Sequence, residues 1–152
     1  MIHHRSQWLG LFSKASDAAL EDALRACGAG PEQDLLHAVW IRPVEIGLIQ
    51  VMARADGTGS PFCFQEATCT RASIRLANGQ TGHALVLGHR TEHCKRVAWL
   101  DAKMQDDAFR EGMGAALMHS LKQSELDLFA SRSAAAEATR VEFFTLAREA
   151  GA

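Results

Sequence analysis

The sequence predicts an α+β fold in which an antiparallel sheet of about four strands is flanked by N-terminal and C-terminal helices. Three observations support this prediction: apolar residues have helical spacing before residue 30, they alternate with polar residues in the middle, and they return to helical spacing after residue 90. We expect one domain over 1–152, with N-terminal helices at 1–30, the sheet at 34–88 and C-terminal helices at 91–149.

The first thirty residues carry the signals of two helices. Three apolar residues share one face of the first: Trp8, Leu11 and Phe12. A second helix is expected at 18–27, because Ser16 followed by Asp17 resembles an N-cap and Gly28 can end the helix in the left-handed conformation.

The next segments are predicted to be strands. The run 35–41 is short and apolar, which would place His37 in an apolar strand as a core histidine. Residues 45–55 are apolar on both faces, which is typical of a central strand covered on both sides. Residues 56–61 (DGTGSP) are rich in turn formers and should reverse the chain.

Residues 62–76 alternate between an apolar and a polar side, as a half-buried strand does. Fifteen residues at about 3.3 Å each would extend nearly 50 Å, so we expect a bulge near 65–67. Asn78-Gly79 is a strong hairpin signal and should pair this strand with 83–87.

Three helical segments are expected in the C-terminal third. The first begins with Thr91 as N-cap, and the second covers 107–122. Ser124 followed by Asp127 resembles a capping box that opens a last helix extending to about residue 148.

That last helix has no large apolar side chain at 130–140, yet Phe143 and Phe144 follow. Either the helix end folds back on its own domain, or its aromatic end docks on a partner, with Arg140 at the rim of the contact. The second interpretation is favoured by the cost of leaving a phenylalanine pair exposed.

Composition excludes several classes of function. The chain has 16 basic and 18 acidic residues and a net charge of −2, so nucleic-acid binding is not expected. No apolar run approaches the 18 or more residues that span a bilayer, and the first ten residues lack a signal-peptide core. We therefore expect a soluble, cytoplasmic protein without a membrane partner.

The cysteines and histidines give no recognised metal or redox spacing. No C-x-x-C is present, and all four cysteines are expected to be reduced: Cys27, Cys63, Cys69 and Cys94. His89, His93 and Cys94 form a local set, and a metal hydrolase there is our third hypothesis. Cys94 beside Lys95 is either a thiol of lowered pKa or, as we prefer, part of an ordinary surface helix. No metal or other cofactor is predicted.

Anion binding is the main alternative that the residues themselves suggest. Arg71 and Arg75 share the polar face of one strand, about 13 Å apart, and Arg90 precedes a helix N-terminus. The same arginines could instead form surface ion pairs. Glu66 lies near the expected bulge, where a buried carboxylate would suit acid–base chemistry or simply pair with an arginine.

Three segments, in order, resemble the PhnG family, the G component of the bacterial carbon–phosphorus lyase system: RPVEIGLIQVMARADGTGSPF, EATCTRASIRLANGQTGHALVLGHR and VEFFTLAR. The likeness spans 44–105 and returns at 140–148. Its markers are Gly57-Thr58-Gly59, Glu66-Ala67-Thr68, Thr70-Arg71, Arg75-Leu76, Gly79, Gly88, His93, Asp101-Ala102 and Phe143-Phe144-Thr145. The family usually has Gly at the position of Gln65 and Ala-Glu at that of Cys94-Lys95.

The resemblance implies an assembly subunit that is not catalytic alone. In that family, PhnG joins the H, I and J subunits of the lyase in a symmetric complex with two copies of each. With H, I and the ATPase-like subunit L, PhnG supports formation of α-D-ribose 1-methylphosphonate 5-triphosphate from ATP and methylphosphonate. The nucleosidase chemistry belongs to the I component and the radical cleavage to the J component. The fold that the family implies is an antiparallel sheet with flanking helices. The runner-up hypothesis is a partner-free module that binds phosphate or phosphonate through Arg71, Arg75 and Arg90, and self-association of the isolated chain remains open.

Overall fold

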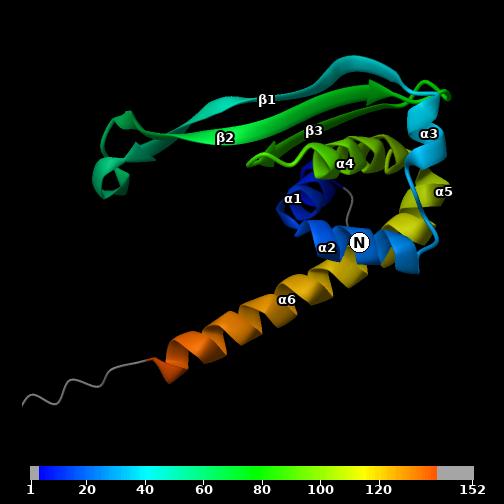
Figure 1. The fold of residues 1–152 in the computed structure, drawn as a ribbon. Coiled ribbons are helices and arrows are strands. Elements are labelled where there is room, and N and C mark those ends of the chain that lie inside the picture. Colours follow the sequence, from blue (N-terminus) through cyan, green and yellow to red (C-terminus); the bar gives the residue numbers. More distant parts are fainter. Residues whose placement is uncertain (1–3, 140–152) are drawn as a thin grey trace, which may run out of the picture.

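A computed structural model describes residues 4–139, in which a three-stranded antiparallel sheet has helices against one of its faces (Figure 1). The strands are β1 (Val39–Arg54), β2 (Pro61–Arg75) and β3 (Thr81–Leu87), in the spatial order β1-β2-β3. The α+β class with flanking helices is confirmed, with three strands where about four were expected.

The helices lie before and after the sheet in the sequence. A 3₁₀ turn at Ala55–Gly57 lies between β1 and β2, and a π-helical segment at Arg110–Gly114 lies between the last two α-helices. The α-helices are α1 (Arg5–Lys14), α2 (Asp17–Ala26), α3 (Glu32–Leu36), α4 (Thr91–Lys103), α5 (Asp107–Phe109) and α6 (Ala115–Ala138). As predicted, the Ser16 hydroxyl caps α2 by accepting from the Ala19 N–H at 3.1 Å, and Gly28 has a φ of +65°.

The core lies between the inner face of the sheet and helices α1, α2 and α4, with the first turns of α6 closing it. The alternation predicted for β2 holds along the half that lies over the helices, where Thr70, Ala72 and Ile74 are buried. The largest fully buried apolar side chains are Phe12, Leu20, Ile74, Leu100, Met104 and Leu117. Apolar faces of helices and sheet therefore meet in one layer of contact, as an α+β fold requires.

The β1–β2 pair is longer than the body it belongs to. Strand β3 pairs with β2 only as far as Cys69, whereas β1 pairs with β2 out to Pro61. Residues 48–68, which we call the ribbon, therefore project past the helices as two strands alone (Figure 1). A bulge interrupts the ribbon at Phe64, because Val51 pairs with Gln65 and Met52 with Cys63. The predicted bulge at 65–67 lies one residue away.

Two strand predictions are confirmed only in part, because residues 39–41 and 45–54 lie in β1 but the rest of each prediction fails. Leu35 and Leu36 belong to α3, and His37 is the exposed residue that ends this helix, since Pro31 and two acidic residues favour a helix start there. Strand β1 is an edge strand rather than a central one, because the sheet order places β2 in the middle. Its two-sided apolar pattern leaves Ile46, Leu48 and Met52 exposed.

The helix boundaries of the C-terminal third also differ from the prediction. No capping box breaks the chain at Ser124, whose hydroxyl donates to the Ser120 carbonyl at 3.1 Å within continuous α6. The N-cap of α4 is Arg90, one residue before Thr91. Gly114 ends the π-helical segment, and a Cβ added there would lie 2.5 Å from the Met104 sulfur. The expected helix end near 148 lies outside the described residues.

Candidate functional site

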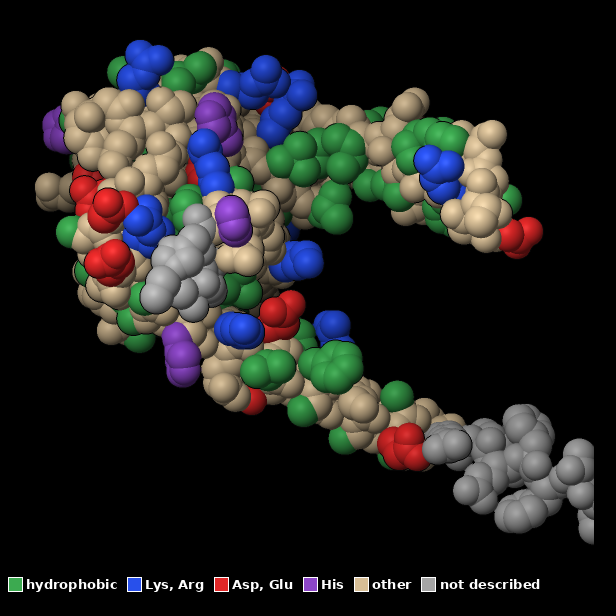
Figure 2. All heavy atoms as spheres, turned by 180° about the vertical axis from the view of Figure 1, so that it is seen from behind, with side chains coloured by type: hydrophobic (Ala, Val, Ile, Leu, Met, Phe, Trp, Pro, Cys, Tyr) green, Lys and Arg blue, Asp and Glu red, His purple; other side chains and the backbone are tan. Residues whose placement is uncertain are grey.

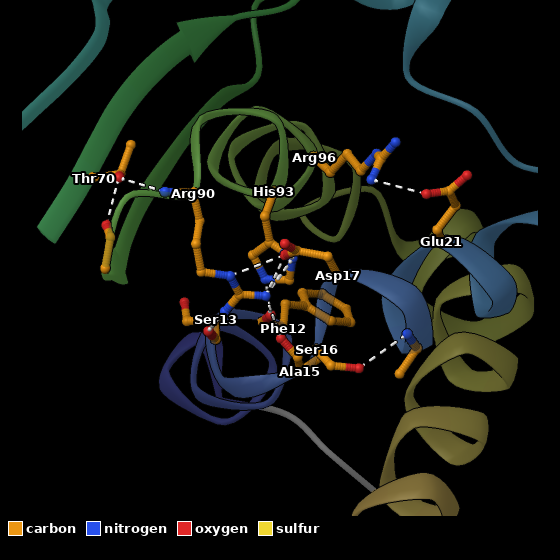
Figure 3. Close-up of polar contacts among 12 residues, drawn as sticks. Phe12, Ser13, Ala15, Ser16, Asp17, Glu21, Thr70, Arg90, His93 and Arg96 are labelled. Atoms are coloured by element: carbon orange, nitrogen blue, oxygen red, sulfur yellow. Dashed lines mark hydrogen bonds and ion pairs between the residues drawn. The ribbon is translucent and has the colours of Figure 1, made fainter.

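The best-defined polar cluster joins α4 to the loop between α1 and α2 (Figure 3). Arg90 donates from Nε to an Asp17 carboxylate oxygen at 2.9 Å and from Nη2 to the Ala15 carbonyl at 2.7 Å. The Arg90 main-chain N–H donates to the Thr70 hydroxyl at 3.0 Å. The guanidinium beside Asp17 lowers the pKa of that carboxyl. Arg90 therefore fastens two helices and a strand together.

His93 belongs to the same cluster and is buried. Its Nε2 lies 2.9 Å from the Phe12 carbonyl, and Arg90 donates from Nη2 to its Nδ1 at 3.0 Å. The Phe12 carbonyl can only accept, which places a proton on Nε2, while Nδ1 also lies 3.0 Å from an Asp17 carboxylate oxygen. Burial lowers the pKa of His93, with the Arg90 charge acting in the same direction. His93 is a structural residue of the α1–α4 contact rather than an exposed histidine.

A second buried group, Asp101 on α4, was not singled out as functional by sequence reasoning. Its carboxylate accepts from Arg5 Nε at 2.9 Å, from the Trp8 indole N–H at 3.0 Å and from the His83 main-chain N–H at 2.8 Å. One carboxylate thereby holds α1 and β3 against α4. The sequence could have indicated this role, because Asp101 lies four residues after Val97 on the apolar face of a helix. A buried carboxylate there needs partners, since an unpaired charge would be costly.

The three arginines of the anion-binding hypothesis are not brought together. Arg71 donates from Nε to Glu45 at 2.9 Å, on the sheet face away from the helices. Arg75 is exposed on that face and has no ion pair within residues 4–139. Arg90 instead points toward the α1–α2 loop, away from the strands (Figure 3). Glu66, which was considered for acid–base chemistry, is exposed on the ribbon.

The cysteines divide between core and surface, and none forms a disulfide. Cys69 and Cys94 are buried, Cys27 is half-buried and Cys63 is exposed. Burial raises the pKa of Cys94 to about 11, and the nearby Cys69 acts in the same direction. A reactive thiolate at Cys94 is therefore not supported. In the part of the chain that the structure covers, no three His, Cys, Asp or Glu side chains gather as a metal site would require.

The largest unexplained feature is apolar surface on two projecting arms. One arm is the ribbon, where Leu48 is 64% exposed and Phe64 62% exposed. The other is residues 122–138 of α6, which we call the helical arm; each of its residues is exposed, and Phe129 is 72% exposed. The two arms leave the body on the same side, and Figure 2 shows hydrophobic side chains on both.

The inner side of the ribbon carries part of this surface. Residues that face each other across antiparallel strands point to the same side of a sheet. Ile46 pairs with Thr70, which is buried against the helices, so Ile46 and Leu48 point to the helix side. The helices cover this side only beneath the body (Figure 1). Leu48 lies on the ribbon beyond them, so the apolar row continues past the helices. Other exposed apolar side chains on the two arms are Met52, Phe62, Leu126 and Leu128.

The aromatic residues predicted to anchor a partner, Phe143 and Phe144, lie outside the described residues, as does Arg140. Residues 4–139 contain no helix that is long and apolar enough to cross a membrane.

Comparison with known proteins identifies the family. The sequence profile of the phosphonate metabolism protein PhnG matches residues 3–149. A protein of Rhizobium meliloti (strain 1021), alpha-D-ribose 1-methylphosphonate 5-triphosphate synthase subunit PhnG, is 33% identical over 148 residues, which cover 97% of this chain and 90% of that protein. The match is nearly complete in both chains, so the chain belongs to the PhnG family.

Proposed function

We propose that this chain is an accessory, assembly subunit of the complex that makes α-D-ribose 1-methylphosphonate 5-triphosphate from ATP and methylphosphonate in phosphonate breakdown by the carbon–phosphorus lyase pathway. The observation that carries the proposal is the exposed apolar surface of the two arms, which on the ribbon is also nearly uncharged. The relative from Rhizobium meliloti is named as a subunit of that synthase, which supplies the identity of the assembly.

The ribbon has the properties of an interface core. Among its 21 residues only Arg54, Asp56 and Glu66 are charged, while monomeric proteins protect exposed strand edges with charge. Charged residues are depleted at the centre of protein interfaces. A two-stranded ribbon by itself is marginally stable in water, so a partner that packs on it would also stabilise its folded conformation.

The helical arm supports the same conclusion. Helix α6 has 24 residues and is about 36 Å long, yet Leu117, Met118 and Leu121 near its start are its only buried side chains in the described chain. Most helix stability in proteins comes from packing of one face. The exposed residues Leu126, Leu128 and Phe129 offer such a face to another subunit.

The polar groups of the body support an assembly role over an independent active site. Arg90, His93 and Asp101 are all engaged in contacts that join helices to the sheet. Within residues 4–139, no buried side-chain nitrogen or oxygen is left without a hydrogen-bond partner. Catalytic groups more often face a cleft, whereas these three side chains are held in contacts inside the body.

We propose the H, I and J subunits of the lyase as the partners, with two copies of each chain in a cytoplasmic assembly. Residues beyond the helical arm would extend its contact, with Phe143 and Phe144 as anchors and Arg140 at the rim.

The test is the native mass of this chain after co-expression with the H, I and J subunits. An assembly with two copies of each chain is the expected result. Recovery of the chain by itself, at 16.5 kDa or a small multiple, in the presence of the three folded partners would overturn the proposal.

A further inference from the structure

Helix α1 contains a glycine that nothing in the described chain requires. Gly10 lies in the middle of Arg5–Lys14, and a Cβ added there would meet no atom within 4 Å. Glycine weakens a helix interior relative to alanine, mainly through the entropy it loses on folding. The fold therefore gains nothing from the missing side chain. A glycine that faces open space suits the close approach of another backbone.

The surface around Gly10 is hollowed on both sides. Between α1 and β3 lies a depression of about 410 Å³, lined by Leu9, Gly10, Ser13, His83, Ala84 and Leu85. Between α1 and α6 lies a second of about 440 Å³, whose lining is mostly polar: Ser6, Gln7, Gly10, Leu11, Lys14, Met118, Lys122 and Glu125. Gly10 belongs to both, so it forms the low ridge between two adjacent hollows. A backbone that crosses at Gly10 could place an apolar side chain in the first hollow and a polar one in the second.

The charges beside the second hollow are unbalanced. Lys14, Lys122 and Glu125 line it, and neither lysine forms an ion pair in the described part of the chain. Other lysines are paired, as Lys95 is with Glu92 and Lys103 with Asp34. The local charge is net positive, which favours a partner with carboxylates at this end.

We infer that a helix of another subunit of the synthase complex packs across α1 at Gly10. This inference rests on the proposed function and adds the place and chemistry of one contact. The occupant is an apolar helix with acidic residues near the end that meets Lys14 and Lys122. The distance between packed helices depends on the side chains at their crossing, and glycine permits the shortest. The position also continues the existing helix layer, in which α1 lies under the sheet next to where the ribbon leaves the body (Figure 1).

The decisive experiment separates the stability of the isolated chain from its assembly. Gly10→Ala should raise the melting temperature of the isolated chain by about 2 °C, because alanine is the better helix former. The same variant should compete poorly for incorporation when co-expressed with tagged wild-type chain and the H, I and J subunits. Gly10→Leu should be at least ten-fold under-represented in the purified complex.

Gly112→Ala is the matched control, because Gly112 also lies within a helical segment and its added Cβ would meet nothing within 4 Å. It should be incorporated equally with wild type. Equal incorporation of Gly10→Leu would overturn the inference, whereas failure of wild type to assemble would instead reject the proposed function. The double variant Lys14→Glu, Lys122→Glu should also be depleted in the purified complex. Equal incorporation of this variant would show that the partner helix has no acidic residues near these lysines.

Discussion

The indole N–H of Trp8 donates to the carboxylate of Asp101 at 3.0 Å, across 93 residues of sequence. Both side chains are buried, and the same carboxylate accepts from Arg5 and from the main chain of His83. This contact ties the first helix to α4 and β3, and so holds the α1 surface in which Gly10 lies.

Asp101→Asn should destabilise the isolated chain by about 3 kcal/mol or more. Asparagine would turn an N–H₂ group toward donors and remove the charge that faces Arg5. The measurement is urea unfolding followed by circular dichroism. Asp56→Asn is the control, because Asp56 is an exposed turn residue with a φ of +51° that asparagine tolerates. Equal stabilities of the two variants would contradict the proposed anchoring role.

Stability should fall as the pH drops below the ordinary histidine pKa of about 6.5, because the folded chain keeps His93 neutral. The pKa of His93 is lowered in the fold, so the unfolded chain binds the proton first and is favoured by acid. Melting temperatures between pH 7.5 and 5.5 measure this. His93→Gln, which retains an N–H donor for the Phe12 carbonyl, should show a shallower slope than wild type; His37→Gln, at an exposed residue, is the matched control.

Arg90→Lys should destabilise the chain by about 1–3 kcal/mol, since an ammonium cannot reproduce the forked contacts to Asp17 and Ala15. Arg75→Lys, on the open sheet face, should change stability little. Thermal unfolding with and without triphosphate also tests the anion-binding alternative. If Arg90→Lys is as stable as wild type but loses a triphosphate-induced rise in melting temperature, Arg90 is a ligand-binding residue instead.

Leu48→Asp should abolish assembly with the partner subunits and leave the isolated fold intact, because Leu48 is exposed in the free chain. Native mass measurement of the co-expressed complex provides the readout. Leu36→Asp is the control, since Leu36 is 80% exposed on α3, away from both arms. Normal assembly of Leu48→Asp would show that the ribbon is not part of the interface.

Thiol alkylation should separate the cysteines by burial. In the native chain Cys63 should react fastest, while Cys94 should stay unmodified because it is buried and its pKa is about 11. Mass spectrometry of tryptic peptides before and after denaturation gives the comparison. Rapid native labelling of Cys94 would show that the first turn of α4 opens readily.

Where a few neighbouring residues determine the local structure, the sequence alone predicted it correctly. Ser16 and Gly28 mark the start and end of α2, and Asn78-Gly79 marks the β2–β3 turn, because caps and turns depend on a few neighbouring residues. The family could likewise be identified from the order of short segments.

Contacts between distant residues decided the rest. An apolar strand has the same pattern whether other elements or a partner cover it, so β1 resembled a central strand and is an edge strand. In the sequence, Arg71 and Arg90 were equally good candidates for binding an anion. Tertiary packing pairs Arg71 with Glu45 and Arg90 with Asp17. The sequence determined the family and most of the elements. The fold alone decided which polar groups are satisfied within the chain and which apolar surfaces remain for another subunit.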